Sequence, residues 1–426
     1  LQVISGTFNA EYGKAMSGIV NIVTKDGGDK FESYLQVYSG DHQSDDNIYK
    51  DLNSYTLTND KNITLNLSGP IIKRKLIFFI SARSYVSDGW LNGLQTFTMY
   101  GDTVHIDNNL NGYFDSTDVK KEPYYRAMNW RDKYSVQTKL TYKLNPKLVL
   151  RLNSIISNEQ WQNYNHYSQI AQEGQKTNYA GGNFTGLKLS QSFSSKTFYD
   201  INIYQSVHEY NAYLYKDPLD PRYVTPDHLF WRNVSGAITP DLSEQYGTGI
   251  NFFPQYTFSR WGVETNRFFR NTTTNSLKWE LTSQVNKYNQ IKLGFELQQH
   301  LLKQDGYALL DSSQSDQIFT PSVPDKKSFN RTTYEYDPFE GSFYVQDKVE
   351  YGDMIINAGI RYEYFDPRSS VPNNIHEPYI KNPRNPALDS LSTEEKETLD
   401  WGSAMYTVED SLGNPVTYTY ADYYQS

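Results

Sequence analysis

The 426-residue chain contains no cysteine, which excludes disulfide scaffolds, thiolate metal sites and cysteine nucleophiles. It also lacks the uninterrupted apolar run of about 18 residues that a membrane-spanning helix requires. The formal net charge of −9 is opposite in sign to the charge of most nucleic-acid-binding proteins, so no nucleic acid is expected as a partner. Residue 1 is a leucine with no basic and apolar leader after it, and we therefore expect the chain to begin inside a longer protein.

Aromatic residues are abundant instead. The chain has 37 tyrosines and 15% aromatic residues, although its mean hydropathy is only −0.70. Transmembrane β-barrels combine these properties, because aromatic girdles lie at both membrane interfaces while every second residue faces a polar interior. The composition therefore favours a membrane location that needs no apolar helix.

Alternating aromatic and β-branched residues predict β-strands, and helical periodicity is nearly absent. About eleven strands are expected: Phe31–Tyr38, Ile63–Ser68, Leu76–Tyr85, Tyr134–Leu144, Leu148–Asn158, Thr185–Phe193, Phe198–Tyr213, Thr272–Gln284, Gln290–Leu302, Glu340–Tyr351 and Met354–Phe365.

The connections between these strands alternate in length. Every second connection is short: Gly69–Lys75, Asn145–Lys147, Ser194–Thr197, Val285–Asn289 and Gly352–Asp353. The others are long and polar: Ser39–Asn62, Val86–Lys133, Glu159–Phe184, Leu214–Asn271 and Lys303–Phe339. Short periplasmic turns and long extracellular loops are typical of a transmembrane barrel, whereas a soluble sandwich has no reason to collect its long loops at one end.

The two faces of the predicted strands differ in polarity. One face of the last strand is apolar, and so is one face of the strand from Gln290: Ile356, Ala358, Ile360, Tyr362, Tyr364; Ile291, Leu293, Phe295, Leu297. The opposite faces are polar or small: Asn357, Gly359, Arg361, Glu363; Gln290, Lys292, Gly294, Glu296, Gln298. We interpret the apolar face as lipid-facing and the polar face as lumen-facing.

These observations predict an all-β protein, a transmembrane antiparallel β-barrel. Single-chain bacterial barrels normally have an even number of strands, and an open sheet edge is not tolerated in lipid. With about eleven strands here, we expect more of the barrel outside this sequence.

The first forty residues resemble the end of the plug domain of TonB-dependent outer-membrane receptors. The residues that carry the resemblance are Phe8–Asp29, FNAEYGKAMSGIVNIVTKDGGD, followed by Phe31–Gly40, FESYLQVYSG. Gly13, Ser17 and Gly18 are small residues that permit tight turns and close backbone approach. Ile19–Thr24 is a short β-prone run that we expect to pair within a small plug sheet.

Two further stretches resemble the same family. Leu67–Arg83, LSGPIIKRKLIFFISAR, is similar to a hairpin near the start of such barrels. Glu340–Pro367, EGSFYVQDKVEYGDMIINAGIRYEYFDP, is similar to a mid-barrel hairpin of the subgroup whose members often carry an N-terminal carboxypeptidase-regulatory-like domain. The resemblance implies about 22 strands around a plug in the complete protein.

It also implies the division of this chain into residues 1–30 as the end of the plug, residues 31–365 as the first half of the barrel, and residues 366–426 as a truncated extracellular loop. The implied location is the outer membrane of a Gram-negative bacterium, in contact with its lipid. The energy-transducing TonB-type complex is expected to bind a segment upstream of Leu1, and a lipoprotein partner is compatible with this plan.

A possible calcium site lies in a predicted extracellular loop. In Asp107–Asp118, DNNLNGYFDSTD, oxygen ligands follow EF-hand spacing, with Gly112 at the sixth position and the Tyr113 carbonyl at the seventh. The candidate ligands are Asp107, Asn109, Asn111, Tyr113, Asp115 and Asp118. Asp118 replaces the usual bidentate glutamate, so we expect weak binding of a structural ion. An ordinary turn cluster of Asn, Asp and Gly is the alternative.

Other candidate sites are weaker. The predicted loops contain many aromatic residues, which bind a ligand or, as we favour, form small loop cores and membrane-interface contacts: Trp90, Trp130, Trp161, Tyr164, Tyr167, Phe230, Trp231, Tyr256 and Trp261. The histidines show no two-histidine metal spacing, and Asp41, Asp45 and Asp46 are interpreted as a solvated loop. Ser17 lacks the frame of a nucleophile elbow.

We therefore expect no enzyme but a receptor that binds a scarce extracellular solute of unknown identity and imports it with TonB-coupled energy. The alternatives are a structural, adhesive or secretion-associated outer-membrane barrel, and a secreted soluble β-rich carbohydrate-binding protein.

Overall fold

The computed structural model of the chain describes residues 2–5, 8–14, 17–21, 23–100, 105–106, 119–223, 258, 262–312, 319–326, 328, 330–369, 405–409 and 415–419. Within these ranges, no helix has both the length and the apolar character needed to cross a membrane.

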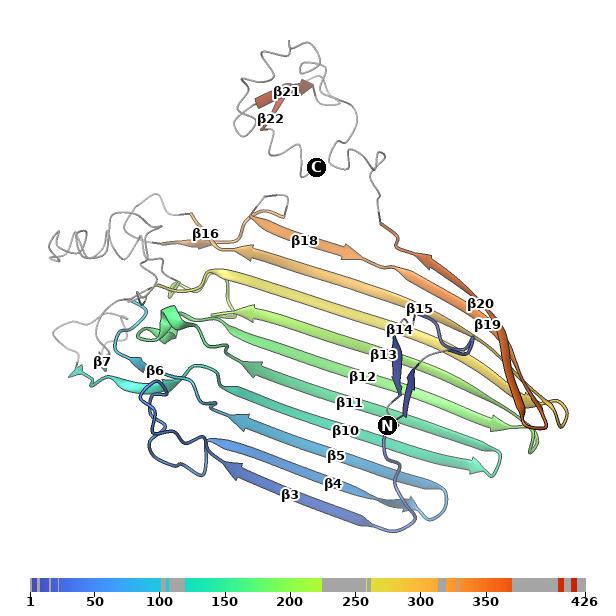
Figure 1. Ribbon diagram of the computed structural model, residues 1–426. Helices are drawn as coiled ribbons and strands as arrows, with labels where there is room; N and C mark the ends of the chain where they lie inside the picture. The colour runs from blue at the N-terminus through green and yellow to red at the C-terminus, as the bar shows by residue number, and fades with distance from the viewer. Residues whose placement is uncertain are drawn as a thin grey trace.

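One antiparallel sheet of twelve strands dominates the described chain (Figure 1). Consecutive strands pair in this order: β3 (Glu32–Gly40), β4 (Asp60–Ile72), β5 (Leu76–Ser87), β10 (Arg131–Asn145), β11 (Leu148–Trp161), β12 (Thr177–Ser192), β13 (Thr197–Tyr213), β14 (Asn266–Gln284), β15 (Asn289–Ala308), β19 (Phe339–Tyr351) and β20 (Met354–Asp366). All eleven predicted strands are confirmed. The twelfth, β18 (Arg331–Tyr336), pairs with the last third of β15 and lies in a segment that we predicted to be loop.

Smaller elements occupy the long connections. Three short antiparallel pairs, β6 (Asn92–Gln95) with β9 (Tyr124–Ala127), β7 (His105–Ile106) with β8 (Val119–Lys120), and β16 (Leu310–Asp311) with β17 (Pro321–Ser322), were not predicted. Two 3₁₀ turns, η1 (His166–Ser168) and η2 (Gln172–Gly174), precede β12. The segment after β20 contains the pair β21 (Met405–Glu409) and β22 (Pro415–Thr419).

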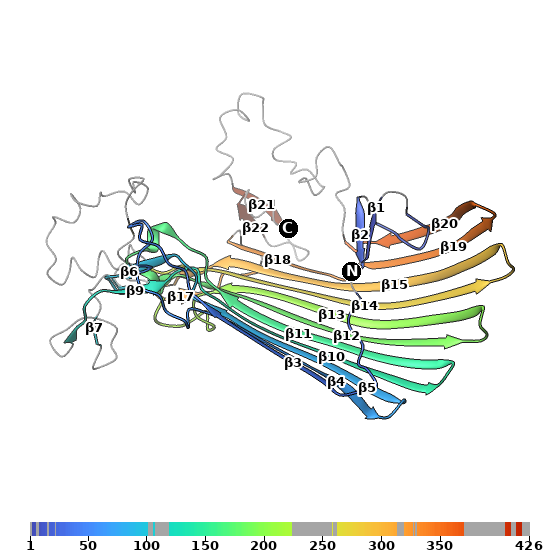
Figure 2. The ribbon, with the colours of Figure 1, turned by 60° about the horizontal axis from the view of Figure 1, so that its bottom comes forward.

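The sheet is curved like a trough, and the long connections meet at one of its ends (Figures 1 and 2). We call this the loop end, and the opposite end, with its tight turns, the turn end. The predicted alternation of short and long connections is thereby confirmed. The sheet does not close on itself within the described residues, because β3 and β20 each pair with one neighbour only.

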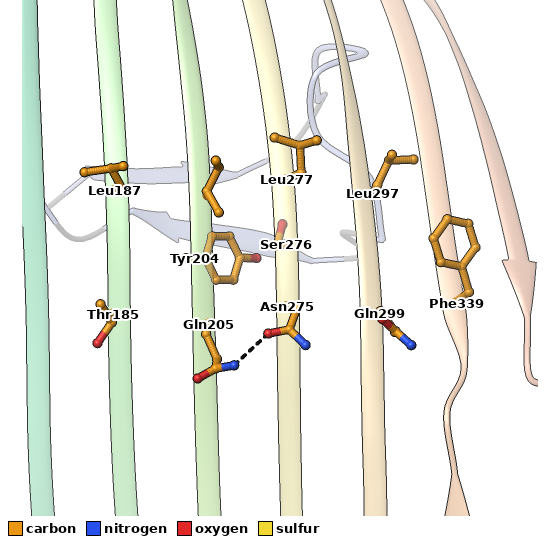
Figure 3. Close-up of a pocket in the computed structure, with 11 residues that line it drawn as sticks. Thr185, Leu187, Tyr204, Gln205, Asn275, Ser276, Leu277, Leu297, Gln299 and Phe339 are labelled. Atoms are coloured by element: carbon orange, nitrogen blue, oxygen red, sulfur yellow. Dashed lines mark hydrogen bonds between the residues drawn. The ribbon is translucent and has the colours of Figure 1, made fainter.

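The convex face of the sheet carries exposed apolar side chains. Register places Leu187, Ile203, Leu277 and Leu297 in one row across β12 to β15, and they line a shallow groove (Figure 3). On β20, Ile360 is 75% exposed. A soluble monomer rarely exposes an apolar surface of this extent, whereas lipid acyl chains cover it in a membrane. The predicted lipid-facing side is therefore the convex face.

A polar row marks one limit of this apolar surface. The next row of the same face toward the loop end consists of Thr185, Gln205, Asn275 and Gln299 (Figure 3). In this row, Gln205 Nε2 donates a hydrogen bond of 2.9 Å to Asn275 Oδ1. Unpaired amides are costly in hydrocarbon. This row therefore fits the interface between the membrane and the extracellular side.

The connections at the loop end pack against each other beyond that row. Tyr223, Leu309 and Phe319 form a small buried cluster. Arg267 is only 3% exposed, and its Nη1 donates to Tyr223 Oη at 2.8 Å. Burying a guanidinium requires such hydrogen bonds, so this arginine ties the strand end of β14 to the loop that precedes it.

The first long connection is organised by Asp41. Its carboxylate accepts hydrogen bonds from the backbone nitrogens of His42 and Thr56 and from Asn59 Nδ2, at 2.8, 2.5 and 2.6 Å. Partial burial raises the pKa of Asp41, but these hydrogen bonds together outweigh it and hold the pKa below the ordinary value of 3.8. Asp41 therefore closes the loop by joining both of its ends, which a purely solvated acidic patch does not do.

Candidate functional site: the N-terminal segment on the concave wall

The described part of the N-terminal segment, which comprises residues 2–30, lies on the concave face of the sheet (Figure 2). It begins with a small antiparallel sheet in which β1 (Gln2–Ser5) pairs with β2 (Gly18–Asn21). The expected pairing of the β-prone run is thus found, but the strand begins at Gly18 and ends at Asn21, and Val23 and Thr24 lie outside it. Two separate anchors hold this segment against the wall.

The loop between β1 and β2 carries the first anchor. Tyr12 N donates to Asn9 O at 3.0 Å, which closes a tight turn. Gly13 follows this turn and lies so close to β20 that a Cβ there would displace the ends of the Arg361 and Glu363 side chains. The close approach predicted at Gly13 is therefore found. Gly18 differs, because a Cβ there would meet only Ile4 O at an ordinary 3.5 Å.

Polar contacts join this turn to β15, β19 and β20. Glu11 forms an ion pair with Lys292 of β15. Its backbone nitrogen donates to Gln346 Oε1 of β19 at 3.1 Å, and its carbonyl accepts from Arg361 Nη1 of β20 at 3.3 Å. Lys14 adds an ion pair with Glu340. Three adjacent strands thus bind one turn of the N-terminal segment, all through their polar faces.

The second anchor lies where the segment enters β3. Lys139 Nζ of β10 contacts Asp26 Oδ1 at 2.5 Å and donates to Thr24 O at 3.2 Å. Arg151 Nε of β11 lies 4.0 Å from the other Asp26 oxygen. Gly27 lies against the backbone of β5 at Phe78 and leaves no space for a Cβ. The carboxylate of Asp26 therefore neutralises a lysine side chain that is only 11% exposed.

These anchors confirm the predicted polarity of the strands. Lys292 and Arg361, which we assigned to the lumen-facing side, both reach the N-terminal segment. Phe343 of β19 pairs with Tyr362 of β20, and Ile360 of β20 pairs with Val345 of β19. Phe343 and Ile360 lie on the convex face, point away from the N-terminal segment and are 51% and 75% exposed. The sequence indicates the segment but not its partners on the wall.

The predicted metal ligands belong to the segment between β7 and β8. The whole of Asp107–Asp118 lies outside the described residues, although the strands on either side of it pair as His105 with Lys120 and Ile106 with Val119. In the part of the chain that the structure describes, no group of three or more His, Asp or Glu side chains can hold a metal ion.

The aromatic residues of the predicted loops differ in their surroundings. Trp130 and Trp161 contact the protein: Trp130 Nε1 donates to Gln162 Oε1 at 2.9 Å, and the Trp161 ring lies 6.0 Å from that of Tyr210. Trp90 and Tyr167 are 43% and 50% exposed. Tyr164 Oη lies 2.9 Å from His166 Nδ1. Four further candidates lie outside the described residues: Phe230, Trp231, Tyr256 and Trp261. No convergent aromatic site is formed by those that are described.

A transmembrane antiparallel sheet with a segment bound on its concave face defines the class of protein as a plugged β-barrel. No protein-family model and no curated protein matches the sequence. The structure is similar to that of P. aeruginosa FpvA in a ferric complex with a heterologous pyoverdine, with 12% identity and a TM-score of 0.51 over 85% of this chain and 41% of FpvA. It is also similar to the unliganded ferric citrate transporter FecA, with 11% identity and a TM-score of 0.50 over 85% of this chain and 42% of FecA.

Both of these proteins are TonB-dependent outer-membrane receptors or transporters. At such identities the likeness shows the fold: this chain has the β-barrel fold of TonB-dependent receptors, and the barrel is not closed within it. The chain spans about two fifths of the length of either structure.

Proposed function

We propose that this chain is part of an outer-membrane receptor that binds a scarce extracellular solute and imports it with TonB-coupled energy. The observation that carries the proposal is the N-terminal segment, which is bound to the concave wall by two polar anchors while the convex wall is apolar. An open channel gains nothing from such a segment, whereas a gated transporter needs one that blocks the lumen and can be displaced.

The rival outer-membrane functions, adhesion and secretion, do not require this segment to be held by contacts that break easily. The anchors consist mainly of ion pairs and hydrogen bonds in the lumen of the barrel. Water takes over the hydrogen bonds when such contacts break, so less free energy is lost than when buried apolar contacts separate. Displacement of the segment is therefore accessible to an external force.

Channel conductance tests the proposal. The natural polypeptide that contains this sequence, purified from outer membranes and inserted into planar bilayers, is expected to show almost no steady conductance. A variant that lacks everything before Phe31 is expected to open a large channel. Steady conductance by the intact protein, or equal conductance of both proteins, contradicts the plugged-receptor proposal.

Energy coupling is tested in cells. Uptake of the solute that the intact receptor binds is expected to stop when the proton-motive force is dissipated, while binding at the cell surface continues. Uptake that persists without the proton-motive force excludes the TonB-coupled mechanism.

We also propose, from the ligand spacing, that Asp107–Asp118 binds a calcium ion that stiffens its loop. The pairing of β7 with β8 supports this because it brings the two ends of the twelve-residue segment together, as a loop around an ion requires.

A further inference from the structure

The concave wall has a second polar region between the anchors and the loop end. A hollow of about 540 Å³ lies over β10 to β14. Lys133 is six residues before Lys139, which reaches Asp26 of the N-terminal segment, so both lysines lie on the concave face. The strand pairing places two neighbouring rows of residues on this concave face. The first row is Lys133, Glu159, Ala180, Tyr210 and Arg270, and the second is Ser135, Ser157, Gly182, His208 and Thr272.

The hollow exists because its floor has almost no side chains. Ala180 and Gly182 of β12 lie between larger residues of β11 and β13. A Cβ on Gly182 would come within 3.0 Å of Ser157 Oγ. The neighbouring Lys133 and Arg270 flank this floor from opposite sides, and both are exposed.

Positive charge exceeds negative charge around the hollow. Glu159 is shared by two cations, with Arg131 Nε at 3.1 Å from Oε1 and Lys133 Nζ at 3.1 Å from Oε2. Arg270 has no carboxylate partner among the described residues, and its guanidinium lies 5.9 Å from the Tyr210 ring. Three cations and one carboxylate leave a formal charge of +2, in a chain whose net charge is −9.

Glu209 also lines the hollow but does not offset this charge. Its neighbours His208 and Tyr210 lie on the concave face, so the alternation of the strand turns the Glu209 side chain to the convex face. There Glu209 Oε1 accepts a hydrogen bond from Asn271 Nδ2 at 3.0 Å. The concave side of the hollow therefore keeps its excess of positive charge.

We propose that this hollow binds an anionic group of the imported solute through carboxylate or phosphate oxygens. This inference rests on the proposed import function. Arg270 provides a planar fork of donors that matches both kinds of anion, and the pair of cations around Glu159 faces it across the bare floor. The hollow opens on the concave side near the loop end, where a solute enters, and not on the convex side that faces lipid.

Binding of two small probes tests the proposal with the natural polypeptide in nonionic detergent. Inorganic pyrophosphate and succinate are titrated by ³¹P and ¹H NMR relaxation at low salt. We expect Arg270→Gln to weaken the binding of at least one probe about tenfold or more, the effect of one charge-assisted hydrogen bond. Glu159→Gln is expected to strengthen binding severalfold, because it removes the carboxylate that competes for Arg131 and Lys133.

Lys303→Gln is the matched control. Lys303 pairs with Asn271 at the same height of the wall but lies on the convex face, where it contacts Glu335 at 2.7 Å. Affinity should not change in this variant. A loss equal to that of Arg270→Gln would mean that the probe binds outside the barrel, as a lipid phosphate does, and overturns the proposal.

Failure of this inference is separate from failure of the proposed function. Probe binding that is absent, or that Arg270→Gln and Glu159→Gln leave unchanged, overturns the anionic site whatever the conductance and uptake experiments show. A site confirmed in a protein that conducts steadily supports the anionic hollow but not import by a plugged receptor.

Discussion

Replacing Lys292 by methionine tests whether the first anchor holds the N-terminal segment on the wall. The substitution keeps most of the length of the side chain and leaves the Glu11 carboxylate without its cation. Removing one partner of a fully buried ion pair costs about 3–5 kcal/mol, whereas an exposed pair contributes about 0–1 kcal/mol. Because Glu11 is 13% exposed and Lys292 26% exposed, we expect a loss of about 1–3 kcal/mol in local attachment, equivalent to ~5- to 150-fold in population.

Hydrogen exchange measures this loss directly. Backbone amides of residues 8–14 in the Lys292→Met protein should exchange faster by that factor, while amides of β15 remain protected. Lys278→Met is the control, since Lys278 contacts Glu280 at 3.0 Å on the same wall and has no partner in residues 8–14. Unchanged exchange in residues 8–14, or the same acceleration in the control, would refute the assignment of the Glu11–Lys292 pair as an anchor.

Three further predictions concern other parts of the molecule. Ile360→Arg places a charge on the convex face and should lower barrel stability in lipid by about 2–4 kcal/mol, measured by urea unfolding in vesicles; a soluble sheet would tolerate it. The hydrogen bonds that depress the pKa of Asp41 stabilise its loop at neutral pH, so protection from proteolysis should be lost as pH falls below 3.8 and should be weaker at every higher pH in Asp41→Asn. Calcium should protect residues 101–118, which include Tyr113 and Phe114, from chymotrypsin with half-saturation at roughly 10⁻⁴–10⁻³ M, and Asp107→Asn should abolish this protection; protection without calcium would contradict the site.

The positions of the strands could be predicted well from sequence, but their ends could not. Near the turn end one face is apolar, so alternation is clear in β19 and β20. Toward the loop end both faces become polar, as in β12, which begins at Thr177 and not at the predicted Thr185. The strand β18 escaped prediction because Asp337 and Pro338 separate it from β19. The pattern of apolar residues indicates which part of each strand contacts lipid, and the strands continue beyond that part.

The partners of the N-terminal segment could not be predicted from sequence. Glu11 and Lys292 are 281 positions apart, and Glu11 and Arg361 are 350 apart. Which lysine or arginine of a polar face reaches the segment depends on the registers of many strand pairs and on the curvature of the sheet. The hollow over Ala180 and Gly182 could not be predicted from sequence for the same reason, since its flanking charges come from three different strands.

The two anchors differ in a way that bears on gating. The first anchor, at residues 11–14, consists of ion pairs and hydrogen bonds to β15, β19 and β20. The second adds apolar packing, because Gly27 lies against Ile77, which is 4% exposed, at the entrance to β3. Water replaces polar contacts at little cost but does not replace buried apolar contact. A force applied to the N-terminal segment should therefore free residues 11–14 while residues 24–27 stay attached, so that the second anchor serves as the hinge about which the segment moves.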